Sequence, residues 1–242
     1  MQKMKLITTA LLFSLALSGC STIDEQTGER KDPLEGFNRT MWDFNYKVVD
    51  PYVLKPVAKG WRDYVPPPVS KGLVNVANNL DEPVSFVNRL LEGEGKKAIV
   101  HFNRFWINSV FGLGGLIDWA SYSDPLKIES NRTLGDMLGS YGVEPGFYVM
   151  LPAYGPTTPR QAIGSAFDLG WIIGPWSLAK TVVQAVDGRA KAIDKEALLD
   201  QAQDPYVTFR EAYYQNLEYR AKDGNIETKS ETLSQEELNE ID

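Results

Sequence analysis

Cysteine and histidine are almost absent from this chain of 242 residues, which has one of each, Cys20 and His101. A single cysteine excludes an internal disulfide, and the two residues together are too few for a Cys/His zinc site. The run Gly112-Leu113-Gly114-Gly115 lacks the Lys-Ser/Thr of a phosphate-binding loop, and no Gly-x-Ser-x-Gly motif occurs. The sequence therefore predicts no catalytic residues, no metal site and no enzymatic activity.

Positive charge and long apolar runs are also scarce. The chain carries 25 Lys and Arg against 32 Asp and Glu, a formal net charge of -7, and its pI is near 4.9. A nucleic-acid-binding protein needs a clustered basic surface, so we expect no nucleic-acid partner. Beyond residue 19 no segment has 18 continuous apolar residues. A membrane-spanning helix is not predicted, whereas helices lying in a membrane interface are compatible with this pattern.

The first twenty residues have the organisation of a bacterial export signal. Lys3 and Lys5 form a positive amino-terminal region, and residues 6–17 form an apolar stretch that is too short to span a bilayer. Leu17-Ser18-Gly19-Cys20 resembles the bacterial lipoprotein signal, in which the cysteine becomes the acylated amino terminus; the alternative is an ordinary secretory signal with a chance cysteine. We expect residues 1–19 to be removed and Cys20 to carry diacylglyceryl and N-acyl groups, with no other cofactor.

The segments that flank the central region are polar. Residues 20–31 are predicted to be a lipidated tether. Cys20 is followed by Ser21 and not by Asp, and in the bacterial lipoprotein pattern this implies sorting to the outer membrane. Residues 223–242 contain seven acidic residues and one lysine. Such a segment buries too little apolar surface to offset its ordering entropy, so we expect a disordered acidic tail. The folded domain is expected over residues 32–222.

Residues 32–222 show helical spacing and helix-start motifs, and 43% of the chain is hydrophobic, which is enough for a core. Asp32-Pro33-Leu34-Glu35 predicts a capping box that opens a helix ending before Asp50-Pro51. Thr158-Pro159 and Asp204-Pro205 predict two further helix starts. Because residues 147–151 form the one β-prone run, the predicted fold class is mostly α, in a single domain.

Two polar stripes at helical spacing are candidates for function. The first, which alternates in sign, is interpreted as a solvated face with side-chain pairs; it comprises Glu35, Arg39, Asp43 and Lys47. The second lies opposite an apolar stripe formed by Ile99, Phe102, Trp106 and Val110. It either faces water or lines a wet cavity while the apolar stripe faces core or lipid. In the second case the channel-lining residues are Lys97, His101, Arg104 and Asn108.

The segment from residue 142 to residue 160 cannot be a continuous helix, because seven glycines and prolines punctuate it. Residues 147–151 and Tyr154 are nevertheless apolar or aromatic. We predict a short hydrophobic hairpin that controls access to a conduit, with hinges at its glycines; the alternative is a buried strand or a core-packing loop. The gate candidates are Gly142, Tyr148, Leu151, Pro152, Tyr154 and Gly155.

Six motifs distributed over residues 32–220 carry a family resemblance. In chain order they are Asp32-Pro33-Leu34-Glu35-Gly36-Phe37-Asn38-Arg39, Trp61-Arg62-Asp63-Tyr64-Val65-Pro66, Leu138-Gly139-Ser140-Tyr141-Gly142-Val143, Leu151-Pro152-Ala153-Tyr154-Gly155-Pro156, Asp204-Pro205-Tyr206 and Arg210-Glu211-Ala212-Tyr213. Together they resemble the MlaA/VacJ family of outer-membrane lipoproteins. Ala153 departs from the family pattern, which often has an aromatic residue there.

The resemblance implies a helical, ring-like domain with amphipathic interface helices, seated in the periplasm-facing inner leaflet of the outer membrane. It implies that misplaced phospholipids leave the outer leaflet through a central amphipathic channel, which maintains lipid asymmetry. The implied partners are phospholipids, a trimeric porin and a periplasmic phospholipid-binding carrier of an ABC transport system. Two alternatives stay open: a structural lipoprotein that scaffolds a porin or envelope complex without moving lipid, and a lipid hydrolase.

Overall fold

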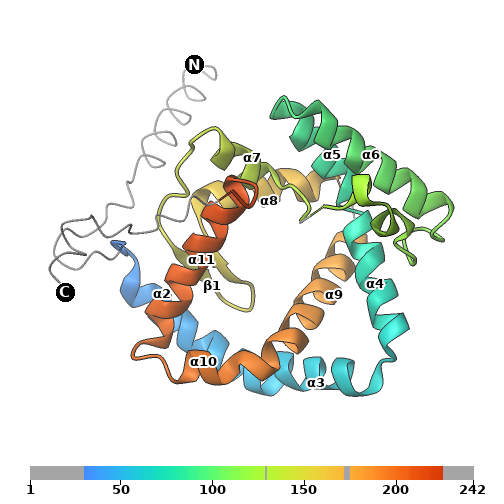
Figure 1. The fold of residues 1–242 in the computed structure, drawn as a ribbon. Coiled ribbons are helices and arrows are strands. Elements are labelled where there is room, and N and C mark those ends of the chain that lie inside the picture. The colour runs from blue at the N-terminus through green and yellow to red at the C-terminus, as the bar shows by residue number, and fades with distance from the viewer. Residues whose placement is uncertain (1–29, 129, 172–174, 226–242) are drawn as a thin grey trace, which may run out of the picture.

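The computed structural model describes residues 30–128, 130–171 and 175–225. The predicted signal peptide, Cys20, most of the tether and residues 226–242 of the tail lie outside the described residues. Within the described ranges the helices form a ring around a central opening, and the one hairpin extends into that opening (Figure 1). The mostly helical, ring-like fold that the sequence and its family resemblance predict is confirmed.

The ring includes helices that are far apart in the sequence but lie side by side. The α-helices are α2 Glu35–Phe44, α3 Lys55–Tyr64, α4 Pro67–Asn79, α5 Glu82–Leu91, α6 Gly95–Val110, α7 Leu134–Ser140, α8 Pro159–Trp171, α9 Pro175–Ala192, α10 Glu196–Asp200 and α11 Pro205–Ala221. The other elements are the π-helix η1 Asn45–Leu54, the 3-10 turns η2 Trp119–Tyr122, η3 Asp124–Leu126 and η4 Ile193–Lys195, and the strands β1 Val149–Leu151 and β2 Gly155–Thr157. The ring closes because α9 packs against both α3 and α4, α5 against α6, and α7 against both α8 and α11.

The predicted helix starts at Pro159 and Pro205 are confirmed. Asp204 accepts hydrogen bonds from the backbone N–H groups of Tyr206 and Val207, as an N-cap does. The capping box predicted at Asp32 is wrong, because α2 begins at Glu35 and its N-cap is Leu34. Asp32 instead accepts hydrogen bonds from the Leu34 N–H and from the side chain of Asn38, and so fixes the approach to the helix rather than its first turn.

The predicted helix end before Asp50-Pro51 is also wrong. The chain continues from α2 through the π-helix η1 into α3, and Pro51 lies inside η1. In a π-helix each N–H pairs with the carbonyl five residues back, as the Lys55 N–H does with Asp50 O. The helix therefore continues through Pro51, which has no N–H to donate. The Asp50 carboxylate accepts two bonds from Arg189, at 2.6 and 2.8 Å, which ties this continuous rod to α9.

An apolar core lies where α2, β1 and α11 meet. Its buried members are Trp42, Tyr148, Met150, Tyr206, Tyr214 and Leu217. The Tyr148 ring lies edge-on to the Tyr206 ring, with centroids 6.0 Å apart, and the Trp42 ring stacks on that of Tyr46 at 5.0 Å. Such aromatic pairs contribute about 0.5–1.5 kcal/mol each beyond area burial, so this corner of the ring is stabilised mainly by apolar contacts.

Candidate functional site

The hairpin predicted within residues 142–160 is present, and its two ends differ in environment. Strands β1 and β2 pair antiparallel, with Leu151 opposite Gly155. At its base Tyr148 and Met150 are buried in the aromatic core, whereas Tyr154 at the tip is 60% exposed. The structure thus anchors the base and directs the tip into the central opening (Figure 1). Whether the hairpin acts as a gate stays a prediction.

Two asparagines of the α2–η1 rod hold β1 in place. The Asn38 amide donates to Tyr148 O at 2.9 Å and accepts from the Met150 N–H at 2.8 Å. Seven residues further along the same face, Asn45 donates to Leu151 O at 2.8 Å and accepts from the Ala153 N–H at 2.7 Å. Each side-chain amide therefore takes the place of a neighbouring strand. We call Asn38 and Asn45 the amide clamps.

The proposed hinge glycines adopt backbone conformations that favour glycine. Gly142 has φ +82° and Gly155 has φ +101°, and a Cβ atom at either position would meet no neighbour within 4 Å. The constraint at both positions is therefore conformational rather than steric. Arg160 holds the segment between them: its Nη1 donates to Val143 O at 2.6 Å, and its guanidinium is buried, which lowers the pKa of Arg160.

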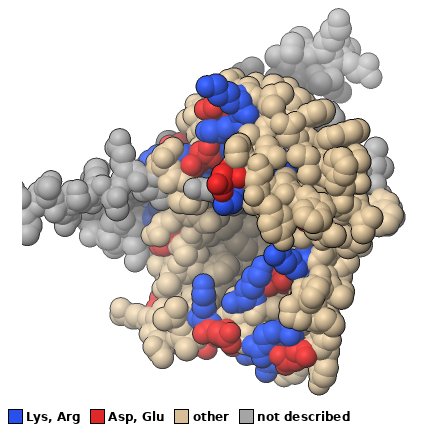
Figure 2. Space-filling view, turned by 45° about the vertical axis from the view of Figure 1, so that its right-hand side comes forward, with Lys and Arg blue, Asp and Glu red and all other residues tan. Residues whose placement is uncertain are grey.

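A polar cavity of about 600 Å³ lies inside the ring, between α4, α5, α8 and α9 and the tip of the hairpin. Helix α9 supplies a stripe at steps of four, three and four residues, formed by Lys180, Gln184, Asp187 and Lys191. Tyr154 of the hairpin also lines this cavity. Figure 2 shows a hollowed face of the molecule with basic and acidic side chains along its edges.

Most charges in this polar cavity are paired, either between elements or within α9. Lys180 forms an ion pair with Asp81, and the Gln184 amide donates to the same carboxylate at 3.2 Å. Lys191 pairs with Asp187 at 2.6 Å. Burial raises the pKa of Asp168, which lies on α8 and lines the cavity. Nearby carboxylates also raise this pKa, and the hydrogen bonds that Asp168 accepts only partly offset the increase. The cavity thus combines fixed charges of both signs.

A second, mostly apolar pocket of about 310 Å³ lies on the other side of the hairpin tip. Its apolar walls include Trp42, Val49, Leu54, Met150, Leu199 and Phe209. Tyr154 lines this apolar pocket and the polar cavity as well, and Ala153 and Gly155 line the apolar pocket beside it. The hairpin tip therefore stands between a polar and an apolar space.

The predicted channel stripe on α6 does not reach either space. His101, Arg104 and Asn108 are 1%, 6% and 3% exposed, and they face carboxylates rather than a cavity. Glu82 of α5 receives His101 Nδ1 and Arg104 Nε, each at 2.6 Å. Lys97, nearer the helix start, pairs with Asp223 at 2.7 Å. Both interpretations are therefore corrected for His101, Arg104 and Asn108, which α5 and the α6–η2 loop cover. Lys97 differs, because its side chain is 45% exposed.

The other polar stripe and the opposite face of α6 behave differently. The solvated interpretation of the α2 stripe is confirmed, since Arg39–Glu35 and Lys47–Asp43 are exposed pairs at 2.7 and 2.9 Å. On α6 the apolar stripe is turned outward, with exposures of 50–58% for Ile99, Phe102, Trp106 and Val110. Helix α6 therefore buries His101 and Arg104 and exposes its apolar stripe.

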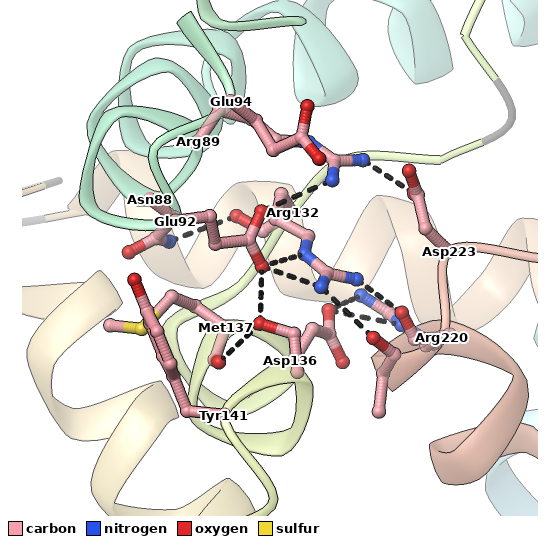
Figure 3. Close-up of polar contacts among 12 residues, drawn as sticks. Asn88, Arg89, Glu92, Glu94, Arg132, Asp136, Met137, Tyr141, Arg220 and Asp223 are labelled. Atoms are coloured by element: carbon pink, nitrogen blue, oxygen red, sulfur yellow. Dashed lines mark hydrogen bonds and ion pairs between the residues drawn. The ribbon is translucent and has the colours of Figure 1, made fainter.

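A second buried ion network joins α5, α7 and α11 (Figure 3). The Glu92 carboxylate, 4% exposed, receives Arg132 at 2.5 Å and Arg89 at 3.1 Å. Arg132 also donates to Arg220 O and Ala221 O at the end of α11, and Arg89 reaches Asp223 at 2.5 Å. Asp223, which the sequence assigns to the disordered tail, is thus bound to the folded domain.

The described residues contain no group of three or more His, Cys, Asp and Glu side chains placed to hold a metal ion. Within the same ranges, no helix has both the length and the apolarity needed to cross a bilayer. The candidate site residues that sequence reasoning missed are the amide clamps and the α9 stripe. The α9 stripe has the same four-three-four spacing as the α6 stripe. Spacing alone therefore could not indicate which of the two stripes lines the cavity.

Comparisons with known proteins agree with this architecture. The chain is 58% identical over 249 aligned positions to the intermembrane phospholipid transport system lipoprotein MlaA of Haemophilus influenzae, covering 99% of this chain and 100% of that protein. It is 42% identical to the protein of the same name from Escherichia coli, covering 99% of each. A solved structure described as the structural basis for maintenance of bacterial outer membrane lipid asymmetry matches with a TM-score of 0.75 and 47% identity, over 79% of this chain and 100% of that one.

The family-level match covers the whole ring and little else. The profile of the MlaA lipoprotein family aligns with residues 30–220, which begin before α2 and end within α11. This range includes the hairpin, both amide clamps and the α9 stripe. The chain belongs to the MlaA lipoprotein family.

Proposed function

We propose that this chain moves phospholipids through the opening of its ring, as part of a system that maintains the lipid asymmetry of the outer membrane. The observation that carries the proposal is the meeting of the polar cavity and the apolar pocket at Tyr154. A phospholipid has one polar end and one apolar end. A site with both kinds of wall accommodates the headgroup in the polar cavity and an acyl chain along the apolar pocket.

The energetics favour such a site over passage through bare hydrocarbon. A charged headgroup costs several kcal/mol or more to transfer without polar partners. The cavity supplies partners of both signs from Asp81, Lys180, Asp187 and Lys191. The outward apolar stripe of α6 fits a ring whose outer wall contacts lipid. The protein then lowers the barrier without any covalent chemistry.

The anchor and the partners belong to the same proposal. Cys20 carries the lipid that holds the chain to the outer membrane, with the ring in the periplasm-facing leaflet. The relatives named above are components of an intermembrane phospholipid transport system. We extend this role to the present chain, with phospholipids taken from the outer leaflet, a periplasmic phospholipid-binding carrier as the recipient, and a trimeric porin as a neighbour.

The hairpin is the proposed gate. Its tip lies between the two spaces, its hinges Gly142 and Gly155 have left-handed backbone conformations, and Asn45 binds the tip through two hydrogen bonds. Movement of the tip away from Asn45 would join the polar cavity to the apolar pocket. The gate therefore opens by releasing the hydrogen bonds of Asn45, with Gly155 as the hinge next to the tip, while Gly142 and the buried base stay in place.

The test of transport uses the purified, full-length lipidated protein in vesicles that contain a fluorescent phospholipid. We expect lipid to move between leaflets or to acceptor vesicles at a rate that depends on the protein. A structural scaffold would move none. A hydrolase would release lysophospholipid or fatty acid, which mass spectrometry would detect.

The test of the gate is a reversible cross-link between Asn45→Cys and Ala153→Cys, two positions whose groups are in hydrogen-bond contact. Cys20 is the one native cysteine and is acylated in the mature protein, so no other thiol competes. Oxidation is expected to stop transport and reductant to restore it, while the single variant Asn45→Cys is insensitive to either. Unchanged transport in the oxidised protein would remove the gate from the mechanism and leave the channel intact.

A further inference from the structure

The way in which the charges of the polar cavity are paired limits the headgroups that it accepts. Its charged lining residues are four cations, Arg132, Lys180, Lys191 and Arg220, and three carboxylates, Asp81, Asp168 and Asp187. Lys180 pairs with Asp81 and Lys191 with Asp187 inside the cavity. Arg132 and Arg220 are neutralised from behind the wall by Glu92 and Asp136, at 2.5 and 2.6 Å. Every cation on the wall therefore already has a carboxylate partner.

Asp168 is the exception among the cavity carboxylates of the described residues, because no ion pair is formed with it. Its two oxygens accept from the Leu134 N–H at 3.1 and 3.4 Å, and the Asn88 side chain also forms a hydrogen bond with this carboxyl. The charged groups that act on it most are other carboxylates, Asp136 and Asp81. The charge left over on the wall is thus negative, and it lies where a cation would relieve repulsion.

A neighbouring acceptor points to the same kind of ligand. The side-chain oxygen of Asn131, another cavity-lining residue, is buried without a donor among the described residues. The Asn131 amide nitrogen is already used, since it donates to Asn78 O at 3.1 Å. This part of the cavity wall can therefore accept further hydrogen bonds, and a donor that carries positive charge fits it best.

We propose that the polar cavity selects zwitterionic phospholipids whose headgroup ends in a primary ammonium, with Asp168 as the acceptor of that ammonium. This inference rests on the transport function proposed above and names its substrate class. The phosphate of the lipid binds to Lys180 or Lys191, and the ammonium binds to Asp168 and to the carboxylate that the lysine releases. The lysine exchanges its carboxylate for the phosphate, and the net charge of the cavity does not change because the headgroup is neutral overall.

An anionic headgroup has no such exchange available. Its phosphate takes a lysine from Asp81 or Asp187 and leaves that carboxylate unpaired beside Asp168, in a partly buried site where an unpaired charge is costly. A trimethylammonium headgroup preserves the charge balance but donates no hydrogen bond, so it binds between the other two classes. The order of affinity is therefore ethanolamine, then choline, then glycerol headgroups.

The test is a titration of the full-length lipidated protein with phosphatidylethanolamine, phosphatidylcholine and phosphatidylglycerol of identical acyl chains, read by native mass spectrometry. We expect the ethanolamine lipid to bind about tenfold more tightly than the glycerol lipid, the size of one charge-assisted hydrogen bond. Asp168→Asn keeps an acceptor for the Leu134 N–H and is expected to lose most of this preference without weakening the glycerol lipid. The matched control Asp124→Asn changes a carboxylate that is 88% exposed and outside the cavity, and it should alter nothing.

A second variant moves the preference in the opposite direction and does not depend on how Asp168 is tolerated. Lys191 is 73% exposed, so Lys191→Gln leaves the fold intact, frees Asp187 and is expected to increase the preference for the ethanolamine lipid. Equal binding of ethanolamine and glycerol lipids by the native protein would overturn the headgroup inference while transport in vesicles stands. Absence of binding and of transport for every lipid would overturn the proposed function itself.

Discussion

Two corners of the ring are held together by opposite kinds of interaction. Where α2, β1 and α11 meet, the interior consists of aromatic and apolar side chains such as Tyr148 and Tyr206. Where α5, α6 and α7 meet, the interior contains Glu82, Arg104 and Glu92, each less than one-tenth exposed. At the second corner the apolar side chains of α6 are turned outward. One corner follows the rule of a water-soluble core, and the other inverts it.

The inversion indicates what surrounds each corner. In water an exposed apolar stripe is a cost, and buried charges gain little over apolar residues of the same size. Beside hydrocarbon the apolar stripe costs nothing, and helices are then held by polar contacts and close packing. The α5–α6 pair therefore has the pattern expected of a lipid-facing element. The aromatic corner differs in its apolar interior rather than in its surface, because Phe37, Phe44 and Val48 of the α2–η1 rod are also exposed.

The largest effect is expected from breaking the ion-paired corner. Glu82→Gln keeps the volume of the side chain but removes the negative charge that His101 and Arg104 share. Loss of one partner from a buried pair costs about 3–5 kcal/mol in the free energy of unfolding. Denaturant unfolding in mild detergent, followed by circular dichroism, measures this loss.

The matched control for this change is Glu35→Gln, which removes the carboxylate of the exposed pair with Arg39. An exposed pair of this kind contributes about 0.5 kcal/mol or less. Equal destabilisation by the two substitutions would show that burial of the Glu82 network has no special importance for stability.

Breaking the aromatic corner is expected to cost somewhat less. Met150 is 1% exposed and borders the apolar pocket, so Met150→Ala both removes buried contacts and enlarges that pocket. Truncations of this kind cost about 2–4 kcal/mol, and the volume-conserving Met150→Leu costs less than about 1.5 kcal/mol. The same unfolding experiment measures both variants. A loss for Met150→Leu as large as that for Met150→Ala would contradict the packing argument.

A pH titration sharpens the comparison, because only the ion-paired corner contains the group concerned. Burial opposes ionisation of Asp223, but hydrogen bonds from Arg89 and Lys97 outweigh it and lower the pKa of Asp223 from 3.8 to about 2. The folded state binds this proton less readily than the unfolded state, so the stabilisation is present above pH 4 and is lost as pH falls toward 2. We expect a loss of about 1 kcal/mol, because the pair is partly screened by water.

The variant Asp223→Asn isolates this contribution. It is expected to be less stable than the native protein at pH 7 by the same amount and to lack the extra decrease between pH 4 and pH 2. Unfolding curves measured at pH 7, 4, 3 and 2 make the comparison. A native protein with no steeper decrease than Asp223→Asn over this interval would show that Asp223 is not held by its two cations.

The features that the sequence predicts correctly depend on residues close together in the chain. The helix starts at Pro159 and Pro205 depend on residues within one turn, and the hairpin depends on glycines and prolines that flank an apolar run. The exposed pairs of the α2 stripe also form within one helix. The ring shape, in contrast, was expected from family resemblance, since nothing in the local patterns determines how the helices close.

What the sequence does not predict depends on contacts between distant residues. Spacing places His101 and Arg104 on one face of α6, but the carboxylate that covers them comes from α5, and Asp118 comes from the following loop. The amide clamps bind backbone groups more than 100 residues away. Pro51 is a helix breaker by local rules, and the π-helix that tolerates it is stabilised by the bond of Asp50 to α9.

The smallest change in the free energy of unfolding is expected from removing the hydroxyl of either of two buried tyrosines at the aromatic corner. The Tyr214 hydroxyl donates to Gly146 O at 3.0 Å, whereas the Tyr148 hydroxyl is buried without a partner among the described residues. Removing a hydroxyl that forms a hydrogen bond costs about 1 kcal/mol, and removing one that forms none relieves a desolvation cost. Tyr214→Phe should therefore destabilise the protein by about 1 kcal/mol, while Tyr148→Phe leaves it unchanged or slightly more stable. Each substitution is the control for the other in the same unfolding experiment, and a larger loss for Tyr148→Phe would mean that its hydroxyl has a partner in the native membrane-bound protein.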